Sequence, residues 1–502
     1  MKQRAPLTLA AVAAALAAIT GIASLTAAPA ASPADGKRAA GSRMPVEQSV
    51  LVCPAPSSSD IAETTYTSIT PGAAGGKGAA RLATKDGKTV LEPKEPGKPV
   101  GATASGAEAP ALTGTASGSL APGWTAQQTT KVAVGQARGL LGVGCTSPGT
   151  DFWFPGVSTA KGRQDYIHLT NPDDTVAEVD IKLYGPDGLL KDKPGSPDRV
   201  FQVDPHSTAR VLLSPLVPDT QVADVTAHVT TGSGRIGASA QISEDGVGAD
   251  WLPASTDPAG SLVLPGIPAD ATSVRLVAYA PGQDDADLRL RLAGPGGTLT
   301  PAGNEQLHVK AGMTASVDLK DVTRGEPGSL LLTPADPKKP VPVVAAVRVV
   351  RGSGTKQELG FVPATSPVGA RATVADNRFD DKATVLALTA VGADAKVRVT
   401  ASAGTEGGGP AVRELTVKAG TTQALSPPPA PTGGKGTYAL TIETLSGGPV
   451  HASRTLTLPQ DGVPMFTVQP FSDDHSTVAV PKPSQDLGVL FQGPAPEGQS
   501  WP

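Results

Sequence analysis

The stretch SVRLVAYAPGQDDADLRLRLAGPGG, residues 273–297, contains two runs in which apolar and polar side chains alternate. In VRLVAY every second side chain is apolar, which is typical of a half-buried β-strand, because successive side chains of a strand point to opposite faces. The closing GPGG favours a tight turn, since glycine adopts positive φ without strain. The stretch therefore predicts a strand, an Asp-bearing turn and a second strand, not a helix.

The same pattern occurs twice more along the chain, as DYIHLTNPDDTVAEVDIKLYGPDG at 165–188 and ATVLALTAVGADAKVRVTASAG at 383–404. Each of the three stretches is followed by a further strand, turn and strand with a valine directly before the turn. These valines lie 106 residues apart (203 to 309) and 108 residues apart (309 to 417): Val203, Val309 and Val417. The spacing predicts that the valines occupy equivalent strands of three sequential repeats.

About seven short strands per repeat, with turns every 8–12 residues, predict immunoglobulin-like or fibronectin-like β-sandwiches. The composition agrees, because 58 Gly and 49 Pro disfavour long helices and only 3% of residues are aromatic. We therefore expect an all-β fold of tandem sandwich repeats behind an N-terminal export segment, arranged as a rod. The expected repeats span 151–258, 259–366 and 367–480.

The chain before and after the three repeats is expected to be less regular. Residues 32–150 would form a degenerate β unit with a flexible Gly/Ala/Pro-rich insert at about 71–123, because this insert contains stretches such as PGAAGGKGAA. Residues 481–502 are interpreted as a disordered tail. They include VLFQGP, which is similar to the cleavage sequence of a picornaviral protease used for protein expression and is therefore excluded from the fold.

Residues 1–31 have the pattern of an export signal, because Lys2 and Arg4 precede an uncharged, Ala-rich run. The small residues at 28–30 favour cleavage. An uncleaved anchor is the alternative, since a helix over 7–28 would be about 33 Å long and could cross a bilayer. In either case the positive start is expected to stay in the cytoplasm, so the rest of the chain would be secreted or anchored outside it.

The two cysteines of the chain, Cys53 and Cys145, are predicted to form a disulfide, because thiols oxidise outside the cytoplasm and only one intrachain pairing exists. A metal site is disfavoured because no His lies at zinc-site spacing from either cysteine. The sequence also leaves open a reactive thiol or two free buried cysteines. On the chain-entropy model, closing this loop stabilises the fold by about 4–5 kcal/mol at most.

Catalytic chemistry is not indicated by the sequence. The six histidines occur singly, and neither H-E-x-x-H nor G-x-S-x-G is present. The net charge is −4, and acidic and basic residues are mixed along the chain without a basic stripe, so a nucleic-acid partner is not expected. We therefore predict that the protein is not an enzyme and uses no cofactor or metal.

Two further patterns have a structural and a functional interpretation. The paired acids at 173–174, 284–285 and 380–381 could supply calcium ligands, but Asp is also a common turn residue, and the spacing resembles no calcium loop. The aromatic cluster TDFWFPG (150–156) could bind a partner or pack between repeats. We favour turns for the acids and packing for the aromatic cluster.

The Ala-rich export signal, LVCPAP (51–56), CTSPGTDFWFPG (145–156) and HLTNPDDTVAEVDIKLYGPDG (168–188) together resemble secreted actinobacterial, Streptomyces-like proteins. They form the domain-of-unknown-function family numbered 5719, and the resemblance covers about 48–480. It implies no catalytic residues. Because genes of this family commonly lie beside one for a large membrane glycosyltransferase, it implies a role in the cell envelope.

We therefore expect a non-catalytic, exported structural or interaction protein of the cell envelope, with a protein partner there. The family resemblance implies membrane glycosyltransferase machinery as one candidate for this partner. Contact with the membrane itself is expected only through residues 7–28, if they are not cleaved. The alternative is a module that binds envelope polysaccharide. The scarcity of aromatic side chains, which stack on sugar rings, favours the interaction protein.

Overall fold

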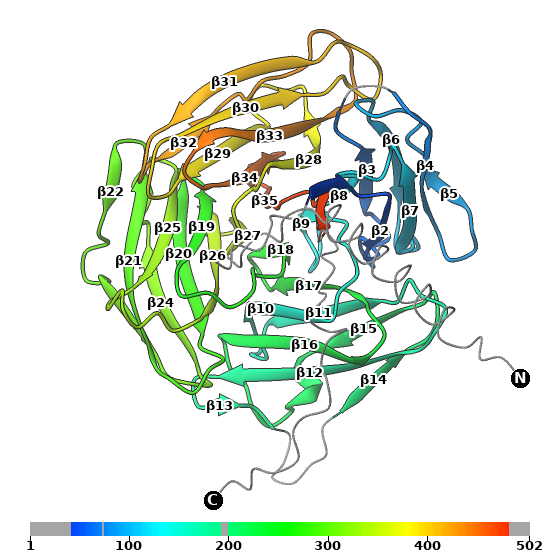
Figure 1. The fold of residues 1–502 in the computed structure, drawn as a ribbon. Coiled ribbons are helices and arrows are strands. Elements are labelled where there is room, and N and C mark those ends of the chain that lie inside the picture. Colours follow the sequence, from blue (N-terminus) through cyan, green and yellow to red (C-terminus); the bar gives the residue numbers. More distant parts are fainter. Residues whose placement is uncertain (1–41, 73–74, 192–198, 481–502) are drawn as a thin grey trace, which may run out of the picture. The chain divides into compact units, whose positions relative to one another are not determined.

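The structure is a computed structural model that describes residues 42–72, 75–191 and 199–480 (Figure 1). The predicted export segment (1–31) and tail (481–502) therefore lie outside the described residues. The chain separates into two compact units, with the break before Pro45 and after Thr477. Strands β1 (Ser42–Pro45) and β36 (Thr477–Val480) form a two-stranded sheet at this boundary. No helix in the described ranges is long and apolar enough to span a membrane.

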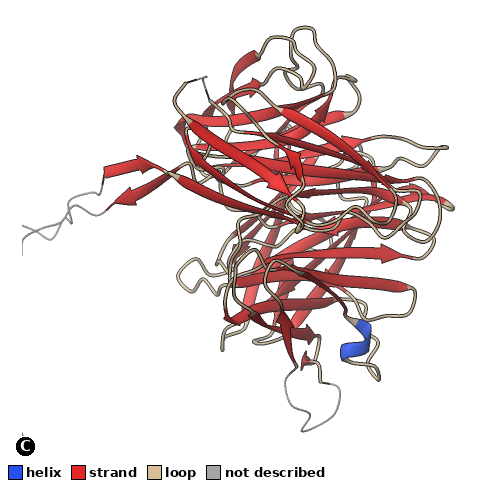
Figure 2. Ribbon diagram, turned by 90° about the vertical axis from the view of Figure 1, so that its right-hand side faces the viewer, coloured by secondary structure: helices blue, strands red, loops and turns tan. Residues whose placement is uncertain are grey.

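The larger unit consists of four β-sandwiches, A to D, each made of two antiparallel sheets (Figures 1 and 2). The first sheet of A has the order β2 (Gln48–Cys53), β7 (Leu112–Gly118), β4 (Gly78–Ala83), β5 (Thr89–Leu91). Its second sheet has the order β6 (Val100–Ser105), β3 (Glu63–Ile69), β8 (Thr125–Val132), β9 (Gly139–Gly144).

Sandwich B has the same layout with one added strand. Its first sheet contains β10 (Asp151–Val157), β16 (Val225–Ser233), β12 (Ala177–Gly185) and β13 (Gly188–Leu189), and β14 (Val200–Val203) also pairs with β12. Its second sheet contains β15 (Thr208–Leu212), β11 (Arg163–Thr170), β17 (Gly237–Glu244) and β18 (Gly248–Leu252). A 3-10 turn at Ser214–Leu216 is the single helical element of the described chain.

Sandwiches C and D repeat this order. The first sheet of C contains β19 (Leu262–Ile267), β25 (Gly328–Pro334), β21 (Ala286–Gly294), β22 (Gly297–Leu299) and β23 (Gln306–Val309), and its second contains β24 (Thr314–Lys320), β20 (Ala271–Tyr279), β26 (Val344–Ser353) and β27 (Lys356–Pro363). The sheets of D contain β28 (Arg371–Arg378), β33 (Thr437–Gly447), β30 (Ala395–Ala401), β31 (Ala411–Val417), and then β32 (Thr422–Leu425), β29 (Thr384–Ala390), β34 (Val450–Thr457), β35 (Phe466–Phe471).

The all-β sandwich fold predicted from the repeats is confirmed. Val203, Val309 and Val417 are buried and pair with an alanine at the start of the central strand of the same sheet: Ala177, Ala286 and Ala395. Alternation places each core, since Leu288, Leu290 and Leu292 of β21 are buried while the residues between them are exposed.

The expectation of a flexible insert at about 71–123 is wrong. This part of the chain forms β4 to β7, which supply three strands to the first sheet of A and one to its second sheet. The Gly- and Ala-rich composition suits these strands because they pack closely. At Gly114 of β7, for example, a Cβ would lie 2.2 Å from the carbonyl oxygen of Arg81 on β4.

The four sandwiches close into a ring, so the expectation of a rod is also wrong. Within the larger unit, β10 of B packs on β20 and β26 of C, β19 of C packs on β29 and β34 of D, and β28 of D packs on β3 and β8 of A. The last strand of each sandwich lies at the centre, where β9, β18, β27 and β35 each contact two of the others (Figure 1). The ring is thus built from four sequential repeats of one chain.

A bulge at the same place in the first strand of B, C and D helps to form three of the four seams of the ring. The pairing slips at Pro155/Val157 in B, Leu264/Ile267 in C and Val374/Asn377 in D. The bulged residues are Gly156, Gly266 and Asp376, at φ of 105°, 77° and 62°. In C the glycine is required, because a Cβ there would lie 2.0 Å from Ser453 Oγ of the next sandwich.

Candidate functional site at the centre of the ring

The residues singled out in the sequence make contacts that hold the fold together. Cys53 and Cys145 form a disulfide with a Cα–Cα distance of 4.4 Å, and the pair is almost fully buried. Cys53 ends β2 and Cys145 directly follows β9, so the bond joins the two sheets of A. It sits where the chain leaves A for B, next to the pairing of Val52 with Thr146.

The paired acids make local contacts at the ends of the sandwiches. Asp173 binds Arg235 with both carboxylate oxygens, at 2.8 and 3.0 Å, and Asp174 contacts His206 at 2.7 Å. Asp285 accepts a hydrogen bond from the backbone N–H of Ala311 at 2.9 Å. These contacts explain the acids as turn residues that tie neighbouring loops together. Among the described residues, no group of three or more His, Cys, Asp or Glu is placed to hold a metal.

The aromatic cluster at 150–156 packs between sandwiches. Trp153 is 6% exposed, stacks on His228 at 3.5 Å and contacts Tyr279 of C at 5.5 Å, measured between ring centroids. Phe154 lies in the core of B. The cluster therefore fills the B–C seam and leaves no exposed aromatic platform there.

The centre of the ring holds buried polar side chains that the sequence analysis did not identify. Asp250 of β18 faces Gly360 of β27, where a Cβ would lie 3.5 Å from its Oδ2. Gln469 of β35 faces Gly142 of β9, where a Cβ would lie 3.0 Å from its Nε2. Asp250 and Gln469, together with Phe466 and Thr467, thus occupy the space that the two glycines leave where the four last strands meet.

Asp250 is fully buried and holds three of the four sandwiches together. Its Oδ1 accepts hydrogen bonds from the backbone N–H groups of Gly142 and Trp251 and from Thr467 Oγ1, at 3.1, 2.8 and 3.1 Å. Its Oδ2 has no partner among the described residues. Burial raises the pKa of Asp250 well above its usual value, and the hydrogen bonds only partly oppose this.

Glu358 of β27 is also fully buried, beside Gly248 of β18, where a Cβ would lie 2.3 Å from its Oε1. Burial raises the pKa of Glu358 to about 9, Arg138 opposes the shift, and Asp250 adds to it. Neither carboxyl oxygen has a hydrogen-bond partner of good geometry among the described residues, although the amides of Leu359 and Ala249 slightly favour the ionised form. Glu358 is therefore protonated at neutral pH.

Arg454 of β34 completes this buried group. It is fully buried, its Nη1 reaches the carbonyl oxygen of Asp376 at 3.4 Å, and its Nε and Nη2 have no partner in the described chain. Burial lowers the pKa of Arg454 to about 10. The side-chain amide of Gln469, the register partner of Arg454, also lacks a hydrogen-bond partner. Such orphan groups at a closed centre are expected to bind buried water.

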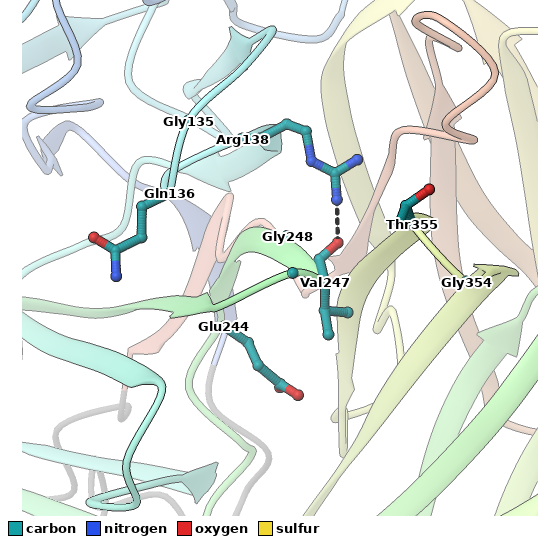
Figure 3. Close-up of a pocket in the computed structure, with 9 residues that line it drawn as sticks. Gly135, Gln136, Arg138, Glu244, Val247, Gly248, Gly354 and Thr355 are labelled. Atoms are coloured by element: carbon teal, nitrogen blue, oxygen red, sulfur yellow. Dashed lines mark hydrogen bonds between the residues drawn. The ribbon is translucent and has the colours of Figure 1, made fainter.

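A pocket of about 410 Å³ opens at one end of this centre (Figure 3). It lies among the turns that precede the last strands of A, B and C. Arg138 of A crosses it and donates from Nη2 to the carbonyl oxygens of Val247 in B (2.5 Å) and Gln357 in C (2.6 Å). The remaining lining consists of four glycines and three residues with polar side chains: Gly135, Gly246, Gly248, Gly354, Gln136, Glu244 and Thr355.

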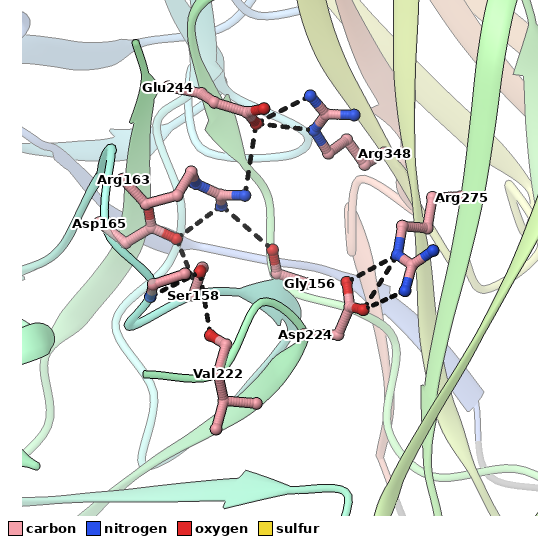
Figure 4. A network of polar contacts seen from close by, with 10 residues as sticks. Gly156, Ser158, Arg163, Asp165, Val222, Asp224, Glu244, Arg275 and Arg348 are labelled. Carbon is pink, nitrogen blue, oxygen red and sulfur yellow. Dashed lines mark hydrogen bonds and ion pairs between the residues drawn. The ribbon is translucent and has the colours of Figure 1, made fainter. Parts of the chain in front are cut away.

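The acidic lining residue, Glu244, is held in an ion-pair network at the B–C seam (Figure 4). Its carboxylate binds Arg348 of C at 2.8 Å and lies 3.5 Å from Arg163, which binds Asp165 at 2.7 Å. Nearby, Arg275 of C binds both carboxylate oxygens of Asp224. Glu244 is therefore already compensated by two guanidinium groups.

Comparison with known proteins identifies a family but no activity. No match is found among curated proteins. The model of a family described as "Family of unknown function (DUF5719)" matches residues 100–428, which include part of A, all of B and C, and part of D. Because this match covers more than half of the chain, the protein belongs to the DUF5719 family.

Proposed function

We propose that the protein is a non-catalytic, exported interaction protein of the actinobacterial cell envelope. The observation that carries this proposal is the closed ring, whose strongly perturbed acids are sealed inside while the loops and outer sheets face outward. A rigid sandwich assembly can present such loops and faces to a partner without chemistry of its own.

The argument against catalysis rests on access. A general acid or base must come within hydrogen-bond distance of its substrate. Asp250 and Glu358 have the perturbed pKa values often found at active sites, but both are 0% exposed. The polar side chains that line the pocket above them are Gln136, Arg138, Glu244 and Thr355, and no Ser, Cys or His is among its lining residues.

The choice of a protein partner over a polysaccharide rests on the aromatic side chains. Stacking on sugar rings requires exposed aromatic faces. The three tryptophans of the described chain, Trp124, Trp153 and Trp251, are between 0% and 6% exposed and pack inside sandwiches or seams. The membrane glycosyltransferase machinery that family resemblance implies is therefore the partner we propose.

The test is purification of the tagged protein from its native host in mild detergent, followed by mass spectrometry. The proposal expects co-purification of envelope membrane proteins. A matched pair of variants links binding to the ring: Thr67→Arg breaks the D–A seam, because Thr67 is buried and bonds Thr437 Oγ1 at 2.6 Å, whereas Thr89→Arg changes an exposed residue of A.

Thr67→Arg should lose the partners and Thr89→Arg should keep them. Recovery of the protein alone, together with hydrolase or transferase activity that one of its own side chains controls, would show that it is an enzyme. Retention on purified cell-wall polysaccharide, with no protein partner, would favour the polysaccharide-binding alternative.

A further inference from the structure

The pocket at one end of the ring centre contains the cationic side chain of Arg138, which forms no ion pair with an acid of the described residues. Arg138 Nη2 is fixed by two carbonyl oxygens, which accept hydrogen bonds but carry no full charge. Its Nη1 is shielded from solvent and has no hydrogen-bond partner within the described ranges. An unpaired, partly buried charge is costly, so the pocket favours a ligand that compensates it.

The acids around Arg138 do not compensate it. Glu244 lies on the pocket wall but is bound by Arg348 and Arg163. Glu358 of the ring centre interacts electrostatically with Arg138, yet its raised pKa of about 9 leaves it neutral at pH 7. Asp165 balances one of the two arginines of the network, and the nearby Asp245 accepts a hydrogen bond from Gln136 and not from Arg138.

The walls leave room for more than a bare ion. A Cβ placed at Gly135, Gly246 or Gly354 would meet no atom within 4 Å, so the three turns border open space. The volume of about 410 Å³ lies in the range of sites for small organic ligands. Nη1 of Arg138 is the buried guanidinium nitrogen without a partner in the described chain, so it is the donor that an entering carboxylate or phosphate would have to reach.

We propose that this pocket binds a small molecule or chain end through a carboxylate or phosphate group that pairs with Arg138. The site lies between A, B and C, so the bound oxyanion also joins three sandwiches at the mouth of the ring. This inference is independent of the proposed partner, because it concerns a small ligand and can be tested on the isolated full chain.

The experiment is isothermal titration calorimetry with sodium phosphate, sodium succinate and sodium chloride at matched ionic strength. Saturable binding of phosphate or succinate, but not of chloride, supports the site, and the tighter of the two identifies the oxyanion. Equal heats for all three salts would mean an adventitious ion only and would overturn the proposal. So would the absence of binding by both oxyanions.

Variants locate the binding. Thr355→Trp fills the pocket from an exposed lining position and should weaken binding by about tenfold or more, whereas Thr300→Trp, at an exposed loop away from it, should not. Arg138→Lys keeps the positive charge but loses the planar guanidinium with its several N–H donors, and should weaken binding similarly. Should this last variant not fold, Thr355→Trp decides alone: unchanged affinity in it refutes the site.

Discussion

Replacing Glu358 with glutamine should remove much of the pH dependence of stability. In the folded protein burial raises the pKa of Glu358 from 4.5 to about 9, whereas in the unfolded chain the carboxyl is exposed to water. Between these values the folded state holds a proton that the unfolded state has released. Rising pH therefore favours unfolding, and a neutral glutamine of nearly the same shape has no such proton to lose.

The magnitude follows from this difference. Each pH unit between the two pKa values lowers the free energy of unfolding by about 1.4 kcal/mol. From pH 5 to pH 8 the wild-type protein should thus lose about 4 kcal/mol that the Glu358→Gln variant keeps, as an upper figure. Near pH 5 both side chains are neutral in the folded state, so the two proteins should differ by only about 1 kcal/mol.

Urea unfolding at a series of pH values, followed by tryptophan fluorescence, measures this effect. Asp250 remains in both proteins, so the pH dependence from its own raised pKa is common to both, apart from its electrostatic coupling to Glu358. Glu326→Gln is a matched control, because Glu326 is exposed. If the stabilities of wild type and Glu358→Gln stay parallel from pH 5 to pH 8, the reasoning about a neutral buried acid is wrong.

Three further changes test the packing of the ring and the disulfide of sandwich A. Gly142→Ala should destabilise the protein by about 1–3 kcal/mol, because its Cβ would lie 2.5 Å from Thr467 Cγ2 of D; Gly296→Ala, where a Cβ meets open space, should be nearly neutral in the same urea assay. Replacing Cys53 and Cys145 together by alanine should lower stability by about 4–5 kcal/mol at most, given their separation of 92 residues; thermal midpoints unchanged by the replacement would contradict this. Arg275→Met should cost about 1–2 kcal/mol by leaving Asp224 without its two-pronged partner, and equal midpoints in urea would refute the role of this pair at the B–C seam.

Periodicity alone was sufficient to predict the sandwiches of the three repeats. Val203, Val309 and Val417 recur at nearly constant spacing because each must fill the same core position beside an alanine. Sandwich A was harder to recognise, because its strands β4, β6 and β7 consist mostly of Gly, Ala, Ser and Thr, a composition that is also typical of linkers. Strand patterns with small side chains carry little hydrophobic contrast.

The site at the centre could not be predicted, because its members come from four different sandwiches. Asp250 and Glu358 each stand alone in the sequence, and nothing local distinguishes them from surface acids. Their burial depends on ring closure, which the repeat period does not specify. One signal was available: the strands β9 and β27 contain Gly142 and Gly360 between large apolar residues, which indicates that another backbone or side chain approaches closely.

The four positions at the meeting point of the central strands carry side chains of different character or size from one sandwich to the next: Gly142, Asp250, Gly360 and Gln469. A homotetramer with exact rotational symmetry would place the same residue at all four, and four aspartates there would repel one another. Covalent fusion of the copies removes this constraint, since each can mutate separately. At these four positions one acid stands with two glycines that leave room for neighbouring side chains, an arrangement that a homotetramer with exact rotational symmetry cannot form.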